Sequence, residues 1–303
     1  MDFKIAAANL EFPEGPIAMR DGSVLLVEIG RATLTRISAQ GDVDIVAHLG
    51  GGPNGAAIGP DGAVYICNNG GMTFARGTDG TMFAHGVPQD YKGGSIQRVD
   101  LETGASTTLY EACGGQRLRG PNDLVFDGAG GFWFTDMGKA TDKTIDKGAL
   151  YYALPDGSSI TRIDVPLITP NGVGLSVDEK NLWVAETLTS RLWSIELSGP
   201  GRLARPVSML TPPHVLGPLP GLQMFDSLAL EADGRVCVAT PLKGAITIFA
   251  TDGTFEQIEL PDLIPTNIAF GGADGRTAWI TAGGTGRLLR AEWPRAGAPL
   301  AFG

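Results

Sequence analysis

The chain has 303 residues, 43% of them hydrophobic, and its formal net charge is −10. Nucleic acid and anionic membrane surfaces are bound by basic patches, so this charge argues against both kinds of partner. The 44 Gly and 20 Pro lie among short apolar runs, which favours many strands joined by turns.

The chain begins with MDFKIAAANLEF, in which the apolar run is too short for a signal peptide, and it contains no uninterrupted run of 18 apolar residues. The three cysteines, Cys67, Cys113 and Cys237, form no C-x-x-C pair, which argues against a zinc or redox motif. We therefore expect a cytoplasmic protein, present as a monomer or a homodimer.

Six similar segments then follow along the chain. In each, a polar residue, usually just after Pro, opens a short apolar run; these residues are Glu14, Asn54, Asn122, Asn171, Asp226 and Thr266. In four segments an acidic residue follows seven positions later, whereas Thr266 needs one extra residue to reach Asp274. Because Asp-Gly pairs between apolar runs are typical of hairpins, each segment predicts the first strand of a repeated unit.

Further strands are expected after each turn. Alternating apolar residues, rich in β-branched and aromatic types, predict second strands at 24–29, 63–68, 131–136, 181–186, 235–240 and 277–282. Third strands are predicted to begin at 32, 94, 148, 190, 244 and 286, and weaker fourth strands cover 42–49, 105–112 and 254–260.

Six units of four antiparallel strands predict an all-β fold, a six-bladed β-propeller that occupies residues 1–303 as a single domain. The sixth unit lacks an obvious fourth strand. We expect the N-terminal stretch FKIAAANL to supply that strand, which would close the ring and cover its last edges.

The first strand of every blade lines the channel of a propeller, so the six polar residues are predicted to meet at one mouth. Two carboxylates, three carboxamides and one hydroxyl would then surround a single point, with no Lys, Arg or His at the equivalent positions. A divalent cation is the simplest counter-charge, and ligands that are all oxygen suit hard ions such as Ca²⁺, Mg²⁺ or Mn²⁺.

The motifs PEGP, GPND, FWFTD, TPNGVGLS, LWVAET and PTNIAFGG occur in an order and spacing that resemble the gluconolactonase family, over nearly the whole chain. This family includes the regucalcin (senescence marker protein) and luciferin-regenerating-enzyme-like proteins. The resemblance implies a six-bladed propeller with one catalytic divalent metal ion in the channel. It also implies a small-molecule lactone as the substrate.

The resemblance further implies roles for individual residues. Glu14, Asn122, Asn171 and Asp226 match the metal ligands of the family, and Ca²⁺ is the ion that we expect first, with Mn²⁺, Mg²⁺, Zn²⁺ or Fe²⁺ as alternatives. Sugar lactonases of the family carry Arg two positions before the first of these Asn residues. Gly120 stands there in this chain, which argues against an aldonolactone substrate.

Other polar and apolar residues are assigned to the surroundings of the metal. Asn54, Asp123, Thr266 and Phe83 are predicted to bind substrate. An outer polar ring is expected from the residues that end the second strands, Glu28, Asn68, Asp136 and Glu186. Binding of substrate by some of them is one alternative, and solvated loop residues are the favoured one. Two long insertions, 69–93 and 211–224, carry apolar side chains that either pack under their own loops or face the pocket, as Met72, Phe74, Met82, Phe83, Leu216 and Leu219.

With this oxygen site, the resemblance implies a metal-dependent lactonase, that is, a carboxylic ester hydrolase. Asp226 is the expected catalytic residue, either as the base that activates water or as the nucleophile. If the insertions face the pocket, the lactone should be less polar than gluconolactone. A phosphotriester or other ester hydrolase on the same metal site is one alternative, and a non-catalytic propeller that binds calcium or a small molecule is the other.

Overall fold

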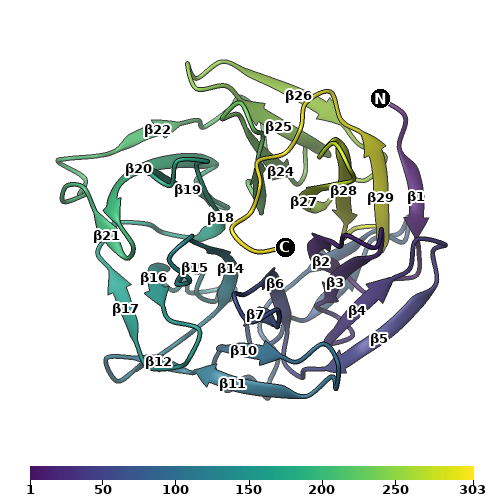
Figure 1. Ribbon diagram of the computed structural model, residues 1–303, viewed down its shortest axis with the longest axis horizontal. Helices are drawn as coiled ribbons and strands as arrows, with labels where there is room; N and C mark the ends of the chain where they lie inside the picture. The colour runs from purple at the N-terminus through teal and green to yellow at the C-terminus, as the bar shows by residue number, and fades with distance from the viewer.

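Six antiparallel sheets surround a central channel in the computed structural model, which describes residues 1–303 (Figure 1). The secondary structure consists of strands, and none of its elements is a helix that could cross a lipid bilayer. The predicted six-bladed β-propeller with four-stranded antiparallel blades is confirmed.

The first three blades follow the repeat directly, with the inner strand first. Blade 1 contains β2 (Pro13–Ala18), β3 (Val24–Glu28), β4 (Thr33–Ile37) and β5 (Val43–His48). Blade 2 contains β6 (Pro53–Ile58), β7 (Val64–Asn68), β10 (Ser95–Val99) and β11 (Ser106–Tyr110). Blade 3 contains β14 (Pro121–Phe126), β15 (Phe132–Asp136), β16 (Ala149–Ala153) and β17 (Ile160–Ile163).

The last three blades are less regular at their outer edges. Blade 4 contains β18 (Pro170–Leu175), β19 (Asn181–Glu186) and β20 (Arg191–Gly199), with β21 (Arg202–Leu203) and β22 (His214–Leu216) both paired to β20. Blade 5 contains β23 (Leu228–Leu230), β24 (Val236–Thr240), β25 (Ala245–Phe249) and β26 (Phe255–Glu259). Blade 6 contains β27 (Pro265–Gly271), β28 (Thr277–Ala282), β29 (Arg287–Glu292) and β1 (Lys4–Ala7).

The ring is closed as the sequence predicts, by the N-terminal strand. In blade 6, β1 is the outer strand, and Lys4 and Ile5 pair with Arg290 and Leu289 of β29. Part of the 211–224 insertion also belongs to a blade, because β22 pairs with Leu192–Ser194 of β20. The insertion therefore supplies a strand that the apolar pattern alone did not indicate.

The apolar core is divided among the spaces between neighbouring blades. Between blades 2 and 3, for example, Tyr65, Phe126 and Phe132 pack together, with ring centroids 5.0–5.9 Å apart. The alternation along each strand produces this arrangement, because successive side chains point to opposite faces of a blade and both faces are covered. Each blade is thus packed against its two neighbours, and this packing holds the first residues of the inner strands in position around the channel.

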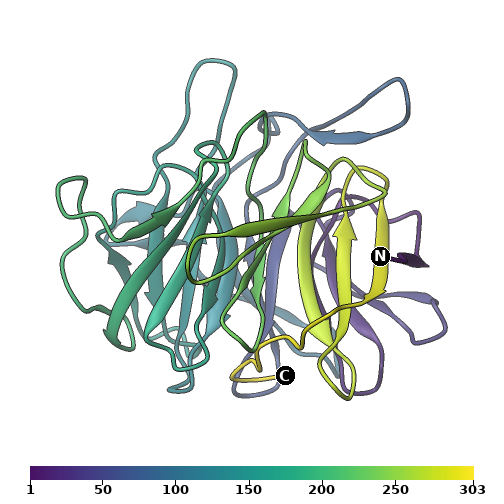
Figure 2. The same cartoon turned by 90° about the horizontal axis from the view of Figure 1, so that it is seen from above.

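Two short hairpins interrupt the repeat. One, β8 (Phe74–Arg76) with β9 (Met82–Ala84), lies in the 69–93 insertion, and the other pairs β12 (Ala112–Cys113) with β13 (Gln116–Arg117). Figure 2 shows the β8–β9 hairpin and the loop after β15 rising from one face of the propeller, while the C-terminal segment crosses the opposite face. We call these the upper and lower faces.

Candidate functional site

The beginnings of the six inner strands meet around the channel. Contacts run from each of these positions to the next: an ideal Cβ on Gly55 would lie 2.6 Å from the backbone oxygen of Asn122, and one on Gly172 would lie 2.8 Å from that of Asp226. The hydroxyl of Thr266 donates a hydrogen bond to the Pro13 carbonyl at 2.8 Å, which joins the sixth blade to the first. The six predicted positions therefore form one ring.

An irregularity of the backbone aims these side chains. The pairing of the inner strand with the second strand shifts register at the same place in five blades: between Glu14 and Ile17, Pro53 and Ala56, Pro121 and Leu124, Pro170 and Val173, and Pro265 and Asn267. Such bulges bend a strand and redirect a side chain, and they are frequent beside active sites. Here the bulges let the polar side chains depart from the in-and-out alternation of the rest of the strand.

The close approach of the inner strands leads to a prediction about stability. In Gly55→Ala the new Cβ would meet the Asn122 carbonyl and the Asp123 Cα, both 2.6 Å away, so blades 2 and 3 must separate. We expect the free energy of unfolding to fall by about 1–3 kcal/mol. Chemical denaturation measures this. In the control Gly128→Ala the nearest atom is a carboxylate oxygen of the Glu179 side chain at 3.2 Å, and a loss equal to that of Gly55→Ala would contradict the explanation.

Glu14 is a buried carboxylate inside the ring, 2% exposed. Its Oε1 accepts a hydrogen bond from the Ser227 hydroxyl at 3.1 Å, and its Oε2 accepts one from Asn267 Nδ2 at 2.8 Å and another from the Gly15 N–H. Burial, together with the negative charges of Asp226 and Asp123, raises the pKa of Glu14 well above its usual value. The side chain is fixed in position but electrostatically unfavourable as an isolated anion.

Asp226 and Asp123 share this unfavourable environment. Burial raises the pKa of Asp123 to about 7, and burial together with the charge of Asp123 raises the pKa of Asp226 to about 7. None of the three carboxylates forms an ion pair with Lys, Arg or His. Asp226 is also the one ring residue of the predicted six that is partly exposed.

The amide side chains of the ring add further oxygen atoms to those of the carboxylates. Asn171 donates from Nδ2 to the Thr187 hydroxyl at 3.0 Å, and its Oδ1 accepts from Ser227 at 3.4 Å. The Oδ1 atoms of Asn54 and Asn122 are buried and have no hydrogen-bond partner. Since buried polar atoms are nearly always paired in proteins, these two oxygens indicate a place where a ligand or an ion completes the site.

Carboxylates and imidazoles alone do not form a metal centre here, because no group of three His, Cys, Asp or Glu side chains is placed to hold an ion. The amide oxygens are needed as well. Carboxylate and amide oxygens without sulfur or imidazole are the ligands that Ca²⁺ and similar hard ions take. The donor set, its negative charge and its unpaired oxygens all fit a divalent cation.

The expected outer polar ring is present, but its residues are not solvated. Glu28, Asn68, Asp136 and Glu186 are all at most 4% exposed. Each accepts hydrogen bonds from the backbone N–H groups that lead into the inner strand of its own blade; Asp136, for example, accepts from Arg119 N and Gly120 N, both at 2.7 Å. The interpretation as solvated loop residues was wrong: they hold the start of the inner strand in place.

Thr266 occupies the sixth ring position, but its hydroxyl is bonded to Pro13 and Thr281 rather than turned to the other ring side chains. Its neighbour Asn267 makes the hydrogen bond to Glu14 instead. The sequence held a signal for this: Asn267, not Thr266, precedes Asp274 by seven positions. Ser227, which bridges Glu14 and Asn171, is a second site residue that the sequence did not single out.

The apolar residues of the two insertions pack into two different clusters. Phe83, Met72 and Phe74 pack with a buried cluster formed by Phe12, Ile29, Met82 and Ile264. Met82 N donates to Gly284 O at 2.8 Å, so this cluster lies at the upper ends of blades 1 and 6, beside the ring. Leu216 and Leu219, by contrast, pack into the core of blades 4 and 5 and take no part in the mouth.

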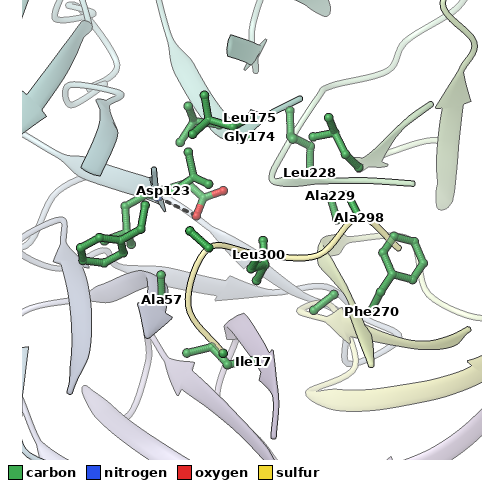
Figure 3. A pocket seen from close by; sticks show the side chains of 18 of the residues that line it. Ile17, Ala57, Asp123, Gly174, Leu175, Leu228, Ala229, Phe270, Ala298 and Leu300 are labelled. Carbon is green, nitrogen blue, oxygen red and sulfur yellow. Dashed lines mark hydrogen bonds between the residues drawn. The ribbon is translucent and has the colours of Figure 1, made fainter. Parts of the chain in front are cut away.

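Below the ring lies a cavity of about 170 Å³ that is lined mainly by apolar residues of the inner strands. Figure 3 shows Asp123 at this cavity, with Ile17, Leu175 and Leu228 around it. The C-terminal segment, with Ala298 and Leu300, passes across the cavity from the lower face, and Phe302 packs edge-on against Phe126 at 5.8 Å. Asp123 thus lies between the carboxylates of the ring and this apolar space.

The structure is a β-propeller with a ring of carboxylate, amide and hydroxyl side chains at one end of its channel. The chain belongs to the SMP-30/gluconolactonase/LRE-like family, whose sequence model matches residues 12–284. The resemblance seen in the motifs is thereby confirmed.

Two relatives are lactonases of staphylococci. Lactonase drp35 of Staphylococcus epidermidis (strain ATCC 12228) is 30% identical over 263 residues, which cover 85% of this chain and 72% of the relative. Lactonase drp35 of Staphylococcus saprophyticus is 29% identical over 252 residues, which cover 82% of this chain and 69% of the relative.

Solved structures share the fold at lower identity. The calcium-binding protein regucalcin from Agrobacterium tumefaciens superimposes with a TM-score of 0.77 at 17% identity, over 99% of this chain and 97% of that protein. A gluconolactonase from Xanthomonas campestris superimposes with a TM-score of 0.75 at 21% identity, over 96% of this chain and 89% of that protein. At these identities the superpositions establish the architecture alone.

Proposed function

We propose that this protein is a lactone hydrolase that depends on one divalent cation. The observation that carries the proposal is a group of three carboxylates, Glu14, Asp123 and Asp226, whose pKa values are raised by burial and, for Glu14 and Asp226, by the charge of a neighbouring carboxylate. No positive side chain pairs with them, and unpaired amide oxygens lie in the same ring. The family and the staphylococcal lactonases support the reaction class.

Glu14, Asn122, Asn171 and Asp226 would hold the ion, and Ser227 would stay hydrogen-bonded to the first of them. Ca²⁺ remains the ion that we favour, since the donors are all oxygen. When bound, the cation would supply Lewis-acid polarisation of the ester carbonyl. The chain itself orients the ligands, because Thr187 holds the Asn171 amide and Asn267 holds the Glu14 carboxylate.

Asp226 is the residue that we propose as general base. It is partly exposed while the other ring side chains are buried, so a water molecule at the mouth can reach it. Its hydrogen bonds from the Ser227 N–H at 3.1 Å and from Asn171 orient the carboxylate. In the reaction it accepts a proton from the attacking water. When the C–O bond of the ring breaks, it returns a proton to the alkoxide, which remains part of the opened product as a hydroxyl group.

The two sides of the mouth differ in polarity, which bears on the substrate. The cluster around Phe83 makes the side of blades 1 and 6 apolar, whereas amides face the side of blades 2 and 3. We therefore expect a lactone with an apolar portion, less polar than gluconolactone, with Phe83 against that portion.

A matrix of metals and substrates tests the proposal. The protein is stripped with a chelator and assayed with Ca²⁺, Mn²⁺, Mg²⁺, Zn²⁺ and Fe²⁺ against sugar lactones, aliphatic and aromatic lactones and phosphotriesters. We expect stripping to abolish hydrolysis and one ion to restore the opening of at least one lactone. Full activity after stripping would contradict the cation, and hydrolysis of phosphotriesters without any lactone would favour the other hydrolase class.

A further inference from the structure

The protein contains three buried side-chain N or O atoms that lack a hydrogen-bond partner, and all three belong to one side of the upper face. They are Asn54 Oδ1, Asn122 Oδ1 and Asn69 Nδ2. Asn54 and Asn122 are neighbours in the ring, in blades 2 and 3. Asn69 follows β7, and its N–H donates to Gly52 O at 2.8 Å, two residues before Asn54. Unpaired atoms are therefore concentrated where blades 2 and 3 meet.

A buried cation lies in the same place. Lys139 is 8% exposed, and its Nζ donates to Asn69 Oδ1 at 3.2 Å and to Gly71 O at 2.7 Å. The ammonium also lies 5.2 Å from the centre of the Tyr91 ring. An ammonium has three hydrogens to donate, so one is left after these two hydrogen bonds.

The positive charge of Lys139 is not neutralised by a contact with a carboxylate. Lys139 forms no ion pair, and its neighbour Arg119 pairs with Asp146 at 2.9 Å. The buried Asp136 is turned to the backbone N–H groups of Arg119, Gly120 and Gly138. Burial lowers the pKa of Lys139 to about 8, in keeping with the cost of holding an unpaired charge inside a protein.

The loop that carries Lys139 borders the ring. Two residues earlier, Met137 Sδ lies 3.8 Å from Asn122 Nδ2 and 3.9 Å from Asn171 Nδ2. The loop that carries Lys139 therefore contacts Asn122 of the ring through Met137, and the backbone of Asn69 is bonded to the segment that leads to Asn54. In a chain with a net charge of −10, Lys139 is thus a buried cation in a loop that borders the ring.

We propose that Lys139 and Asn69 form a subsite for a carboxylate of the substrate, so that the enzyme prefers lactones that carry a separate carboxylate group. A carboxylate placed there would form an ion pair with the ammonium of Lys139 and accept a hydrogen bond from the unpaired Nδ2 of Asn69. Both unpaired donors would then have a partner. This inference rests on the proposed lactone hydrolysis and identifies the class of lactone. The polar end of the substrate would then lie over blades 2 and 3 and its apolar portion over blades 1 and 6.

The test compares two lactones that differ in one charge: 5-oxotetrahydrofuran-2-carboxylate and its uncharged carboxamide. The measured quantity is the ratio of kcat/KM for the carboxylate to kcat/KM for the amide. We expect Lys139→Met to lower this ratio at least tenfold, mainly through KM, and Lys139→Gln to do the same while keeping a hydrogen-bond donor. Lys143→Met is the matched control, since Lys143 is an exposed lysine of the same loop, and it should leave the ratio unchanged. An unchanged ratio in a folded Lys139 variant would overturn the subsite.

Binding separates the failure of this inference from the failure of the proposed reaction. Tetrahydrofuran-2-carboxylate has no ester bond, so its affinity can be measured by calorimetry whether or not the protein hydrolyses lactones. We expect Kd to rise at least tenfold in Lys139→Met and not in Lys143→Met, with thermal melting to verify folding. Equal affinities, or no binding by the unsubstituted protein, would exclude the carboxylate subsite even if neutral lactones are hydrolysed.

Discussion

Asp226→Asn is expected to lower kcat/KM for lactone hydrolysis by roughly a thousandfold or more, because positioned proton transfer contributes about 10²–10⁴-fold and the same carboxylate would hold the cation. An amide keeps the shape of the side chain but cannot accept a proton at neutral pH. Asp226 is hydrogen-bonded by Ser227 N–H and approached by Asn171, and both contacts tolerate an amide oxygen. The fold should therefore survive.

Two further measurements make this result specific. Calorimetry with the favoured ion separates a loss of cation binding from a loss of proton transfer. The control Asp90→Asn removes an exposed carboxylate from the 69–93 insertion and should retain full activity. If Asp226→Asn keeps more than a tenth of the activity with the cation bound, Asp226 is not the base.

Glu14→Gln is expected to weaken cation binding at least a hundredfold and, at the same time, to stabilise the metal-free protein. The amide can occupy the present geometry without conflict: Gly15 N–H and Asn267 Nδ2 both donate to one carboxylate oxygen, while Ser227, a hydroxyl that can also accept, faces the other. The substitution removes one of three mutually repelling charges.

The sign of the stability change follows from the raised pKa of Glu14. A carboxyl whose pKa is raised by folding stabilises the folded state below its unfolded pKa and loses that contribution as pH rises through the folded pKa. At pH 8, without metal, the charged form opposes folding, so we expect Glu14→Gln to raise the free energy of unfolding by about 1–3 kcal/mol.

Thermal melting with and without the cation measures both effects in one experiment. The unsubstituted protein should gain about 2.7 kcal/mol at a cation concentration of 100 Kd, whereas the variant should gain far less. If the metal-free variant is instead less stable than the unsubstituted protein, the hydrogen bonds of the Glu14 carboxylate contribute more to stability than its burial and its repulsion by Asp123 and Asp226 cost.

The architecture was predictable because it repeats. A polar residue, an apolar run, a turn and a second run recur six times, with Asp-Gly at four of the six turns, so an error in one copy could not conceal the pattern. What the pattern missed is irregular: Leu216 in β22 lies in a stretch rich in Pro and Gly, where no alternation marks a strand. Pairing with β20, not local preference, makes it a strand.

Ring positions were likewise predictable, but the partners of the ring residues were not. The register of the repeat indicated that Glu14 and Asp226 belong to the ring. The partners of Asp136, by contrast, are backbone N–H groups, which every residue but Pro possesses and which therefore leave no mark in the sequence. The contact of Lys139 with Asn69 depends on two loops from different blades, whose paths no periodicity describes. Sites assembled from such loops require the structure.

The pairing of β1 with β29 has a consequence for how the protein reaches its native state. These strands come from opposite ends of the chain, so their contact has a sequence separation close to the maximum that the chain allows. Loop-closure entropy opposes such contacts, and a topology that depends on them folds slowly. Without β1, β29 presents an unpaired edge, so the closure of the ring depends on this one non-local contact.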